Sequence, residues 1–194
     1  MLATVTAMPN SNPVPTGSGG FMHPETIAAE FGIREGMSIA DFGSGAGYFT
    51  ILMGQMVGEN GKVYALDIQE TALDSVRVKA RAVGLKNIET IRTNLEVVGS
   101  SGLPDDSQDV VLLANILFQS DAKVEIIRES ARVLKTGGLL ILIDWRLRTG
   151  GFGPPDERRT DEPALRSLVT GEKLTFERMI NAGQFHYGMI FVKP

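Results

Sequence analysis

The chain of 194 residues carries a net charge of −4, and its length and apolar content are those of one globular domain. A nucleic-acid partner is not expected, because a phosphate-binding face needs clustered lysine and arginine. The sequence contains no cysteine, which excludes disulfides, zinc–thiolate sites and thiol catalysis. No apolar run is long enough to span a membrane, and no basic region precedes the mildly apolar start. We therefore expect a cytoplasmic protein without a membrane partner or a signal peptide.

A polar leader is predicted to precede the folded domain. Residues 9–20 are rich in proline, asparagine, serine and glycine, so residues 1–20 are expected to be flexible. Residues 21–194 are expected to form a single domain. Pro24 suits the first turn of a helix that runs through Phe31, and Gly32 is expected to end that helix.

Strands and helices then alternate along the chain. Buried strands are predicted at Ser38–Phe42, Lys62–Ile68, Asn87–Thr93, Val110–Ala114 and Leu139–Ile143. Helices with one apolar face are predicted between them, ending at about Val57 and covering Glu70–Val83 and Asp121–Leu134. The pair Gly137-Gly138 is expected to end the last of these helices. Such alternation implies a parallel sheet with right-handed crossovers.

The chain changes character after the fifth strand. Residues Arg146–Arg159 combine arginine, glycine, proline and acidic residues, and we expect a flexible loop. Its arginines are expected to stay in solvent, with closure over an anionic substrate as the alternative. A short helix at Pro163–Val169 precedes two strands, Leu174–Ile180 and Tyr187–Val192. Residues 181–186 are too few for a helical crossover, so these strands should pair antiparallel. The predicted fold class is α/β: a doubly wound, mostly parallel seven-stranded sheet with helices on both faces and a C-terminal antiparallel hairpin at its edge.

The most informative motif lies between the first strand and the next helix. Residues Asp41–Gly47 follow the pattern D-x-G-x-G-x-G, in which alternate glycines turn the chain and let a ligand lie against bare backbone. A dinucleotide fingerprint would require glycine at position 48, where the sequence has Tyr48. A Walker phosphate loop would require a lysine that the segment lacks. The motif therefore indicates a cofactor cradle of a different kind.

This motif resembles the first motif of class I S-adenosylmethionine-dependent methyltransferases. Three further segments match that family in order: Val63–Ile68 resembles its second strand with a terminal acid, Leu103–Val111 resembles the approach to its fourth strand, and Leu134–Leu140 resembles its helix end and fifth strand. The resemblance covers roughly Met22 to the C-terminus. It implies a Rossmann-like sheet with six parallel strands and one reversed, and it implies S-adenosyl-L-methionine as the cofactor.

The resemblance also implies roles for individual residues. Asp67, twenty residues after Gly47, is expected to accept hydrogen bonds from both ribose hydroxyls, with a solvated strand-end aspartate as the alternative. Asp41 is expected either to help anchor the methionine end of the cofactor or to brace the turn by accepting backbone N–H bonds. The predicted cofactor contacts are Asp41, Gly43, Ser44, Gly45, Gly47, Tyr48, Asp67, Ile68, Asn94, Leu95, Ala114 and Asn115.

Two of these positions carry further expectations. Asn94 stands where the family usually has an acid that contacts the adenine amino group. Its amide oxygen can accept a hydrogen bond from that amine, but a turn-forming asparagine is the open alternative. Ala114-Asn115 ends the fourth strand, where backbone contacts to the cofactor are expected. Asn115 or Gln119 is expected to face the substrate.

Catalysis by such a site depends on alignment, and a general base is needed only if the nucleophile arrives protonated. The candidate catalytic residues are His23 before the first helix, Asn115, and Asp144 after the fifth strand. His186 and Tyr187 are also titratable, but His186 is expected to be structural. Trp145 is expected to belong to the core or to form the wall of a flat substrate site. No metal site is predicted.

The leading hypothesis is an S-adenosylmethionine-dependent methyltransferase that transfers a methyl group in line to a nucleophile on a small molecule. The alternative is an S-adenosylmethionine-binding module without independent catalysis, acting as the partner subunit of a complex. Asn94 and the lack of an evident general base motivate that alternative. A nicotinamide oxidoreductase is disfavoured by Tyr48 and the edge hairpin. The sequence is compatible with a homo-oligomer.

Overall fold

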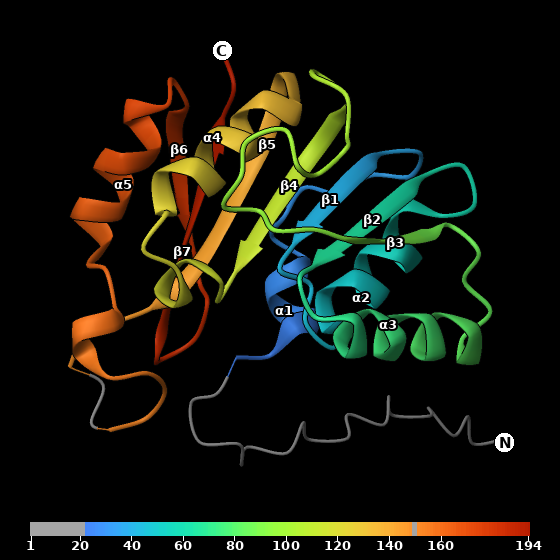
Figure 1. The fold of residues 1–194 in the computed structure, drawn as a ribbon, viewed down its shortest axis with the longest axis horizontal. Helices are drawn as coiled ribbons and strands as arrows, with labels where there is room; N and C mark the ends of the chain where they lie inside the picture. Colours follow the sequence, from blue (N-terminus) through green and yellow to red (C-terminus); the bar gives the residue numbers. More distant parts are fainter. Residues whose placement is uncertain (1–21, 149–150) are drawn as a thin grey trace, which may run out of the picture.

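Seven strands form one mixed sheet in the computed structural model, which describes residues 22–148 and 151–194 (Figure 1). The strand order is β3-β2-β1-β4-β5-β7-β6. Strand β7 runs antiparallel to both β5 and β6, and the other neighbouring pairs are parallel. The strands are β1 Ser38–Phe42, β2 Lys62–Asp67, β3 Ile88–Arg92, β4 Gln108–Ala114, β5 Leu134–Trp145, β6 Thr175–Ile180 and β7 His186–Val192. The predicted fold class is confirmed, whereas the predicted leader lies outside the described residues.

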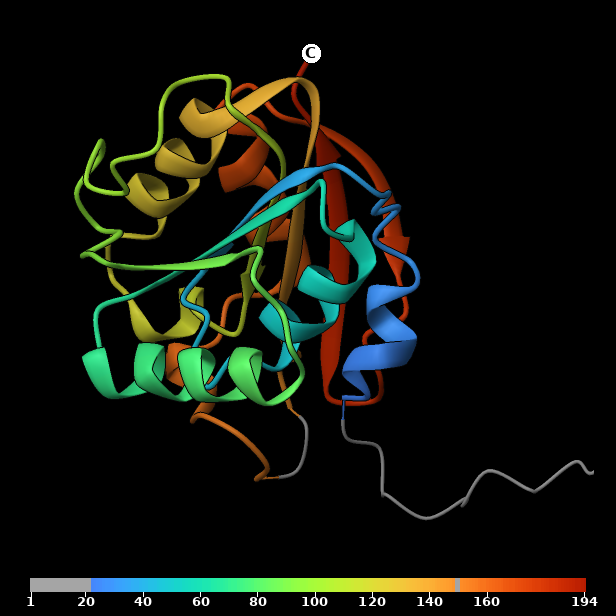
Figure 2. The ribbon, with the colours of Figure 1, turned by 90° about the vertical axis from the view of Figure 1, so that its right-hand side faces the viewer.

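Helices cover both faces of the sheet (Figure 2). Buried side chains of α1 and α2 pack on one face, and those of α4 and α5 pack on the other. The helices are α1 Pro24–Ala28, α2 Tyr48–Val57, α3 Glu70–Ala82, η1 Leu117–Gln119, α4 Lys123–Val133, η2 Asp156–Arg158 and α5 Glu162–Gly171. None of the helices in the described part of the chain combines the length and the apolar character needed to cross a bilayer.

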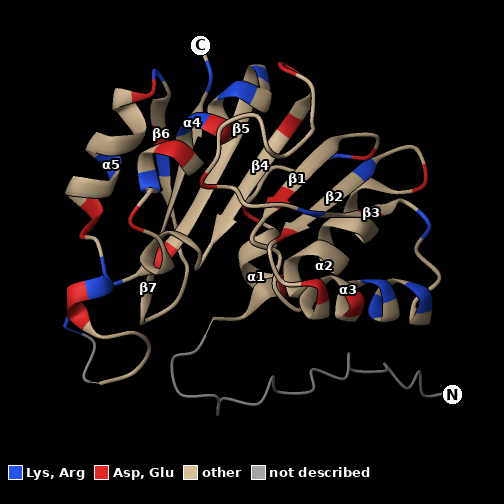
Figure 3. Ribbon diagram, viewed as in Figure 1, with Lys and Arg blue, Asp and Glu red and all other residues tan. Residues whose placement is uncertain are grey.

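Helix α3 packs against β2 and β3 and carries its charges in an order that favours the helix. Its first turn contains the acidic Glu70, and its last turn contains the basic residues Lys79 and Arg81 (Figure 3). Acidic groups near a helix N-terminus and basic groups near its C-terminus complement the helix dipole. This charge order stabilises α3, which begins shortly after Asp67 at the end of β2.

The sequence predicted that the pair Gly137-Gly138 ends a helix, and this prediction is wrong. Helix α4 ends at Val133, and both glycines lie within β5, at a bulge where the pairing with β4 shifts register. The N–H of Gly137 donates to the carbonyl of Lys193, and the N–H of Lys193 donates to Gly138. Gly137 has a φ of 77°, a left-handed conformation that glycine adopts readily. The glycines thus belong to a bulge in β5.

The loop after β5 also differs from the prediction. Arg159 is buried instead of solvated, and its guanidinium donates to the backbone carbonyls of Arg146, Phe152 and Pro154. These contacts draw the described parts of the loop around one side chain. Asp144, expected after the fifth strand, lies within β5 because the strand extends to Trp145.

Candidate functional site

The glycine motif forms a tight turn at the carboxyl end of β1. Gly43, Gly45 and Gly47 have φ values of 73°, 51° and 80°, which are left-handed conformations that residues with a Cβ rarely adopt. The N–H groups of Gly43 and Ser44 donate to the carbonyl of Leu66 at the end of β2, at 2.8 and 3.0 Å. Helix α2 begins immediately after Gly47. The turn therefore exposes backbone at the edge where open α/β sheets bind ligands.

Asp67 ties this turn to the end of β2. Its Oδ2 accepts a hydrogen bond from the N–H of Gly45 at 2.9 Å, and its Oδ1 accepts one from the N–H of Gln69 at 2.9 Å. Each carboxylate oxygen has two lone pairs, so both oxygens can accept further hydrogen bonds. Asp67 therefore fixes the geometry of the turn and still presents acceptors to a ligand.

A cavity of about 330 Å³ opens beside these groups. Backbone of the glycine turn, the end of β2, the loop after β3 and the segment around η1 form its walls. The lining residues are Gly43, Gly45, Asp67, Ile68, Gln69, Thr93, Asn94, Leu95, Glu96, Ile116, Gln119, Ser120 and Ile126. A Cβ on Gly43 would lie 2.5 Å from Ile116 Cδ1, whereas a Cβ on Gly45 would meet no atom within 4 Å. Gly45 thus presents open backbone to the cavity, and Ile116 closes over Gly43.

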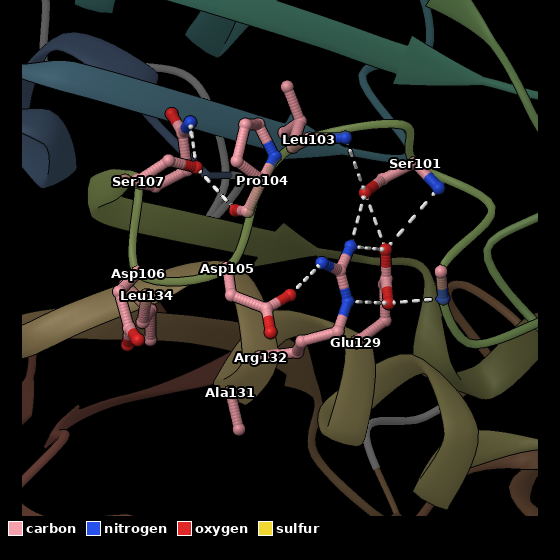
Figure 4. Close-up of polar contacts among 12 residues, drawn as sticks. Ser101, Leu103, Pro104, Asp105, Asp106, Ser107, Glu129, Ala131, Arg132 and Leu134 are labelled. Atoms are coloured by element: carbon pink, nitrogen blue, oxygen red, sulfur yellow. Dashed lines mark hydrogen bonds and ion pairs between the residues drawn. The ribbon is translucent and has the colours of Figure 1, made fainter.

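The loop between β3 and β4 is held in place by a buried carboxylate. Glu129 of α4 accepts from the N–H groups of Gly99 and Ser101, and it contacts the Ser101 hydroxyl and the Arg132 guanidinium (Figure 4). Arg132 also pairs with Asp105 at 2.5 Å. Although burial opposes ionisation, the hydrogen bonds from Arg132, Ser101 and Gly99 lower the pKa of Glu129 to about 2. A permanent charge therefore anchors the loop whose first residues line the cavity.

Asp41 lies beneath the glycine turn. The residue is 3% exposed, and its Oδ2 accepts a 2.5 Å hydrogen bond from the Thr50 hydroxyl of α2. Burial raises the pKa of Asp41 to about 7, against the effect of the Thr50 hydrogen bond, and the charge of Asp67 raises it further. The site therefore holds a carboxyl group that titrates near neutral pH below the turn.

The ends of β4 and β5 bring two other predicted residues together. The N–H of Asn115 donates to the carbonyl of Ile143, one residue before Asp144. Asn115 has a φ of 57°, and its Oδ1 is buried without a hydrogen-bond partner among the described residues. Burial raises the pKa of Asp144 to about 6, although the N–H of Trp145 donates to its Oδ1. Asn115, directly after β4, and Asp144, near the end of the neighbouring β5, thus lie at the ligand-binding edge.

The remaining titratable candidates occupy different surroundings. His23 is exposed and precedes α1. His186 is buried against Trp145, with ring centroids 4.1 Å apart, and burial lowers its pKa to about 4. Burial also raises the pKa of Tyr187, whose hydroxyl donates to the carbonyl of Thr160. His186 therefore belongs to the packing at the start of β7.

The cavity includes half of the residues predicted to contact the cofactor. The predicted residues that line it are Gly43, Gly45, Asp67, Ile68, Asn94 and Leu95. Those outside its lining are Asp41, Ser44, Gly47, Tyr48, Ala114 and Asn115. The ring of Tyr48 is exposed, with Lys79 Nζ 4.0 Å from its centroid, and a Cβ on Gly47 would contact Val76 of α3 at 2.8 Å. Gly47 therefore lets α3 pack closely against the turn, and Tyr48 lies at the rim of the turn.

Six lining residues were not singled out from the sequence. They are Gln69, Thr93, Glu96, Ile116, Ser120 and Ile126. Two of them could have been inferred from their neighbours, since Glu96 closely follows Asn94 and Ile116 directly follows Asn115. Ser120 and Ile126 line the cavity because the chain after η1 returns to it. No local sequence pattern predicts that course of the chain.

Comparisons with known proteins place this geometry in a family. A family model described as "Methyltransferase domain" matches residues 33–181. The crystal structure of a SAM-dependent methyltransferase from Aquifex aeolicus is 30% identical, with a TM-score of 0.81 over 90% of this chain and 91% of that chain. The arsenic (III) S-adenosylmethionine methyltransferase CrArsM from Chlamydomonas reinhardtii is 19% identical and shares the fold, with a TM-score of 0.65 over 83% of this chain and 64% of that chain.

A curated relative is similar over a shorter part of the chain. The ubiquinone/menaquinone biosynthesis C-methyltransferase UbiE of Escherichia fergusonii is 34% identical over 115 residues. The matched segment is 59% of this chain. The chain thus spans 45% of the length of the relative.

Proposed function

The chain belongs to the methyltransferase domain family, and we propose that it is an enzyme that transfers a methyl group from S-adenosyl-L-methionine to a small molecule. The observation that carries this proposal is the meeting of the Gly45 backbone and the Asp67 carboxylate in one cavity at the carboxyl edge of the sheet. The family match favours catalysis over a binding module without activity.

The residues present suit this cofactor. Gly45 leaves room where a side chain would stand, and Asp67 offers lone pairs for the two hydroxyls of a ribose. Ile68, 56% exposed, and the buried Leu95 supply apolar surface for a flat base. The negative charge of Asp67 also favours a cationic ligand. A polar sugar acceptor, an open backbone and apolar walls together fit an adenosine-containing sulfonium.

The other predicted contacts take supporting roles in this proposal. Asp41 is placed below the turn, where its carboxyl group would favour the amino group at the methionine end of the cofactor. Ser44, Gly47 and Tyr48 shape the turn, and Asn94 lies beside the base. Ala114 ends β4, and Asn115 follows it, on the side proposed for the substrate.

S-adenosyl-L-methionine, when bound, supplies a methyl group on a sulfonium. The sulfur leaves as a neutral thioether when the methyl group is transferred. The protein then has to align the acceptor and exclude water, and such positioning is worth roughly 7–11 kcal/mol. Asn115 Oδ1 and Asp144 Oδ2 are buried without a hydrogen-bond partner among the described residues. They can accept a hydrogen bond or a proton only from a substrate whose binding uncovers this edge of the sheet. His23, exposed before α1, is the remaining candidate.

The substrate is proposed to be a small molecule. The loop after β3 and the segment around η1 form walls of the cavity, which supports a compact acceptor. The name of the UbiE relative describes carbon methylation in quinone biosynthesis, which makes aromatic ring compounds one class to test.

The proposal is tested by a transfer assay with radiolabelled S-adenosylmethionine. Phenols, aromatic ring compounds, amines, thiols, proteins and RNA would be offered to the purified chain. We expect label in one of the small-molecule classes and none in RNA. Calorimetric binding of S-adenosylhomocysteine without transfer to any acceptor would instead support the binding module.

A further inference from the structure

Lys79 of α3 contacts the glycine turn although it does not line the cavity. Its Nζ donates a 2.7 Å hydrogen bond to the carbonyl of Ala46, and it lies 4.0 Å from the centroid of the Tyr48 ring. Ala46 directly follows Gly45, whose backbone lines the cavity. One cation therefore contacts both the second half of the turn and the ring at its rim.

Strand β2 holds the first half of the turn, and Lys79 holds the second. The carbonyl of Leu66 accepts from the N–H groups that begin the turn, and Asp67 accepts from the N–H of Gly45. The carbonyl of the following residue, Ala46, accepts from Lys79. Gly45 therefore lies between two anchors, one supplied by the end of β2 and the other by α3.

A turn built on alternate glycines benefits from such anchors. Gly45 and Gly47 have left-handed backbone conformations, and a glycine can leave its conformation easily because it has no Cβ. Fixing the backbone of a residue has an entropic cost. A ligand that meets a turn already fixed by the protein bears less of that cost. A side chain outside the cavity can therefore raise the affinity for a ligand within it.

We propose that Lys79 is a positioning residue that preorganises the glycine turn for the cofactor, an inference that rests on the proposed function. Its ammonium holds the Ala46 carbonyl and thereby keeps the Gly45 backbone open toward the cavity. The Tyr48 ring, 68% exposed, lies against the same ammonium, which is attracted to the face of the ring. Removing the ammonium should leave the fold intact and let the turn depart from its ligand-binding conformation.

Calorimetry with S-adenosylhomocysteine on the 194-residue chain tests this assignment. Lys79→Met keeps an unbranched side chain and removes both the donor and the charge. Its dissociation constant should rise roughly five- to tenfold, the factor expected when about one more backbone residue has to be ordered on binding. Lys79→Arg should stay within about twofold of wild type, because a guanidinium also donates to carbonyls and stacks on aromatic rings.

Arg81→Met is the matched control. Arg81 lies in the same last turn of α3, and its Nε donates to the carbonyl of Arg77 within the helix. Each methionine variant removes one cation from the C-terminus of the helix, so both should lower the thermal unfolding temperature slightly. Only Lys79→Met should lose affinity for S-adenosylhomocysteine, because only Lys79 contacts the turn.

Hydrogen exchange reports on the turn itself. Without ligand, the peptide that covers residues 43–47 should exchange faster in Lys79→Met than in wild type, and saturating S-adenosylhomocysteine should remove the difference. Three results would overturn the role of Lys79 alone: wild-type affinity in Lys79→Met, an equal loss in Arg81→Met, or an equal loss in Lys79→Arg. If wild type does not bind S-adenosylhomocysteine, the proposed function fails as well.

Discussion

Replacing the buried Asp41 by asparagine should stabilise the protein above neutral pH. Asp41 is 3% exposed, and its burial raises its pKa from 3.8 to about 7. Folding therefore favours the protonated carboxyl group, and the folded state must either keep the proton or ionise a buried group. Asparagine has the same shape, keeps an oxygen that can accept from Thr50, and carries no charge.

The size of the effect follows from the two pKa values. Below about pH 4, Asp41 is protonated in both the folded and unfolded states, so its titration does not affect stability. Between pH 4 and 7 only the unfolded state loses the proton, and the folded state is progressively destabilised. Each pH unit corresponds to about 1.36 kcal/mol, so the full effect is on the order of 4 kcal/mol above pH 7.

Urea unfolding at several pH values measures this effect directly. The difference in unfolding free energy between Asp41→Asn and wild type should grow with pH and level off above about 7. Asp109→Asn is a control of the same chemical kind, since Asp109 pairs with Lys135 and accepts from the N–H of Ser38. That variant should be less stable than wild type at pH 8. A stability difference for Asp41→Asn that does not change with pH would refute the reasoning.

Three further changes have defined outcomes. Asp67→Ala should weaken S-adenosylhomocysteine binding on the order of 100-fold, because two hydrogen bonds to a charged group are lost; unchanged calorimetric affinity would remove Asp67 from the site. Gly43→Ala should lower the thermal unfolding temperature more than Gly45→Ala, because only the first Cβ collides with Ile116; equal shifts would contradict this. Wild type should lose on the order of 3 kcal/mol as Glu129 is protonated between about pH 4.5 and 2, whereas Glu129→Gln should show no such loss on acid unfolding.

The parts of the fold that the sequence predicted are those set by local pattern. The strand ending at Phe42, the turn at Gly43–Gly47 and the acid at the end of β2 follow from short motifs, and they come together because parallel strands end at one edge. The C-terminal hairpin followed from the short connection between its strands. These features depend on neighbours in sequence.

The features that the sequence did not predict depend on contacts that follow no periodic spacing. Arg159 is buried because three carbonyls of the preceding loop turn toward it, and arginine in a polar loop otherwise stays in solvent. Gly137-Gly138 forms a bulge because Lys193, the residue after β7, exchanges backbone hydrogen bonds with these glycines from the far end of the chain. Glu96 meets Ser120 across 24 residues. No periodicity in the sequence reports such encounters.

A crystal structure of the chain grown with S-adenosylhomocysteine would test the central claim most directly. The nucleoside should occupy the cavity beside Gly45, with both ribose hydroxyls within hydrogen-bond distance of the Asp67 carboxylate. A nucleoside bound at a different surface, or a saturated crystal in which Asp67 contacts no ribose, would contradict the account.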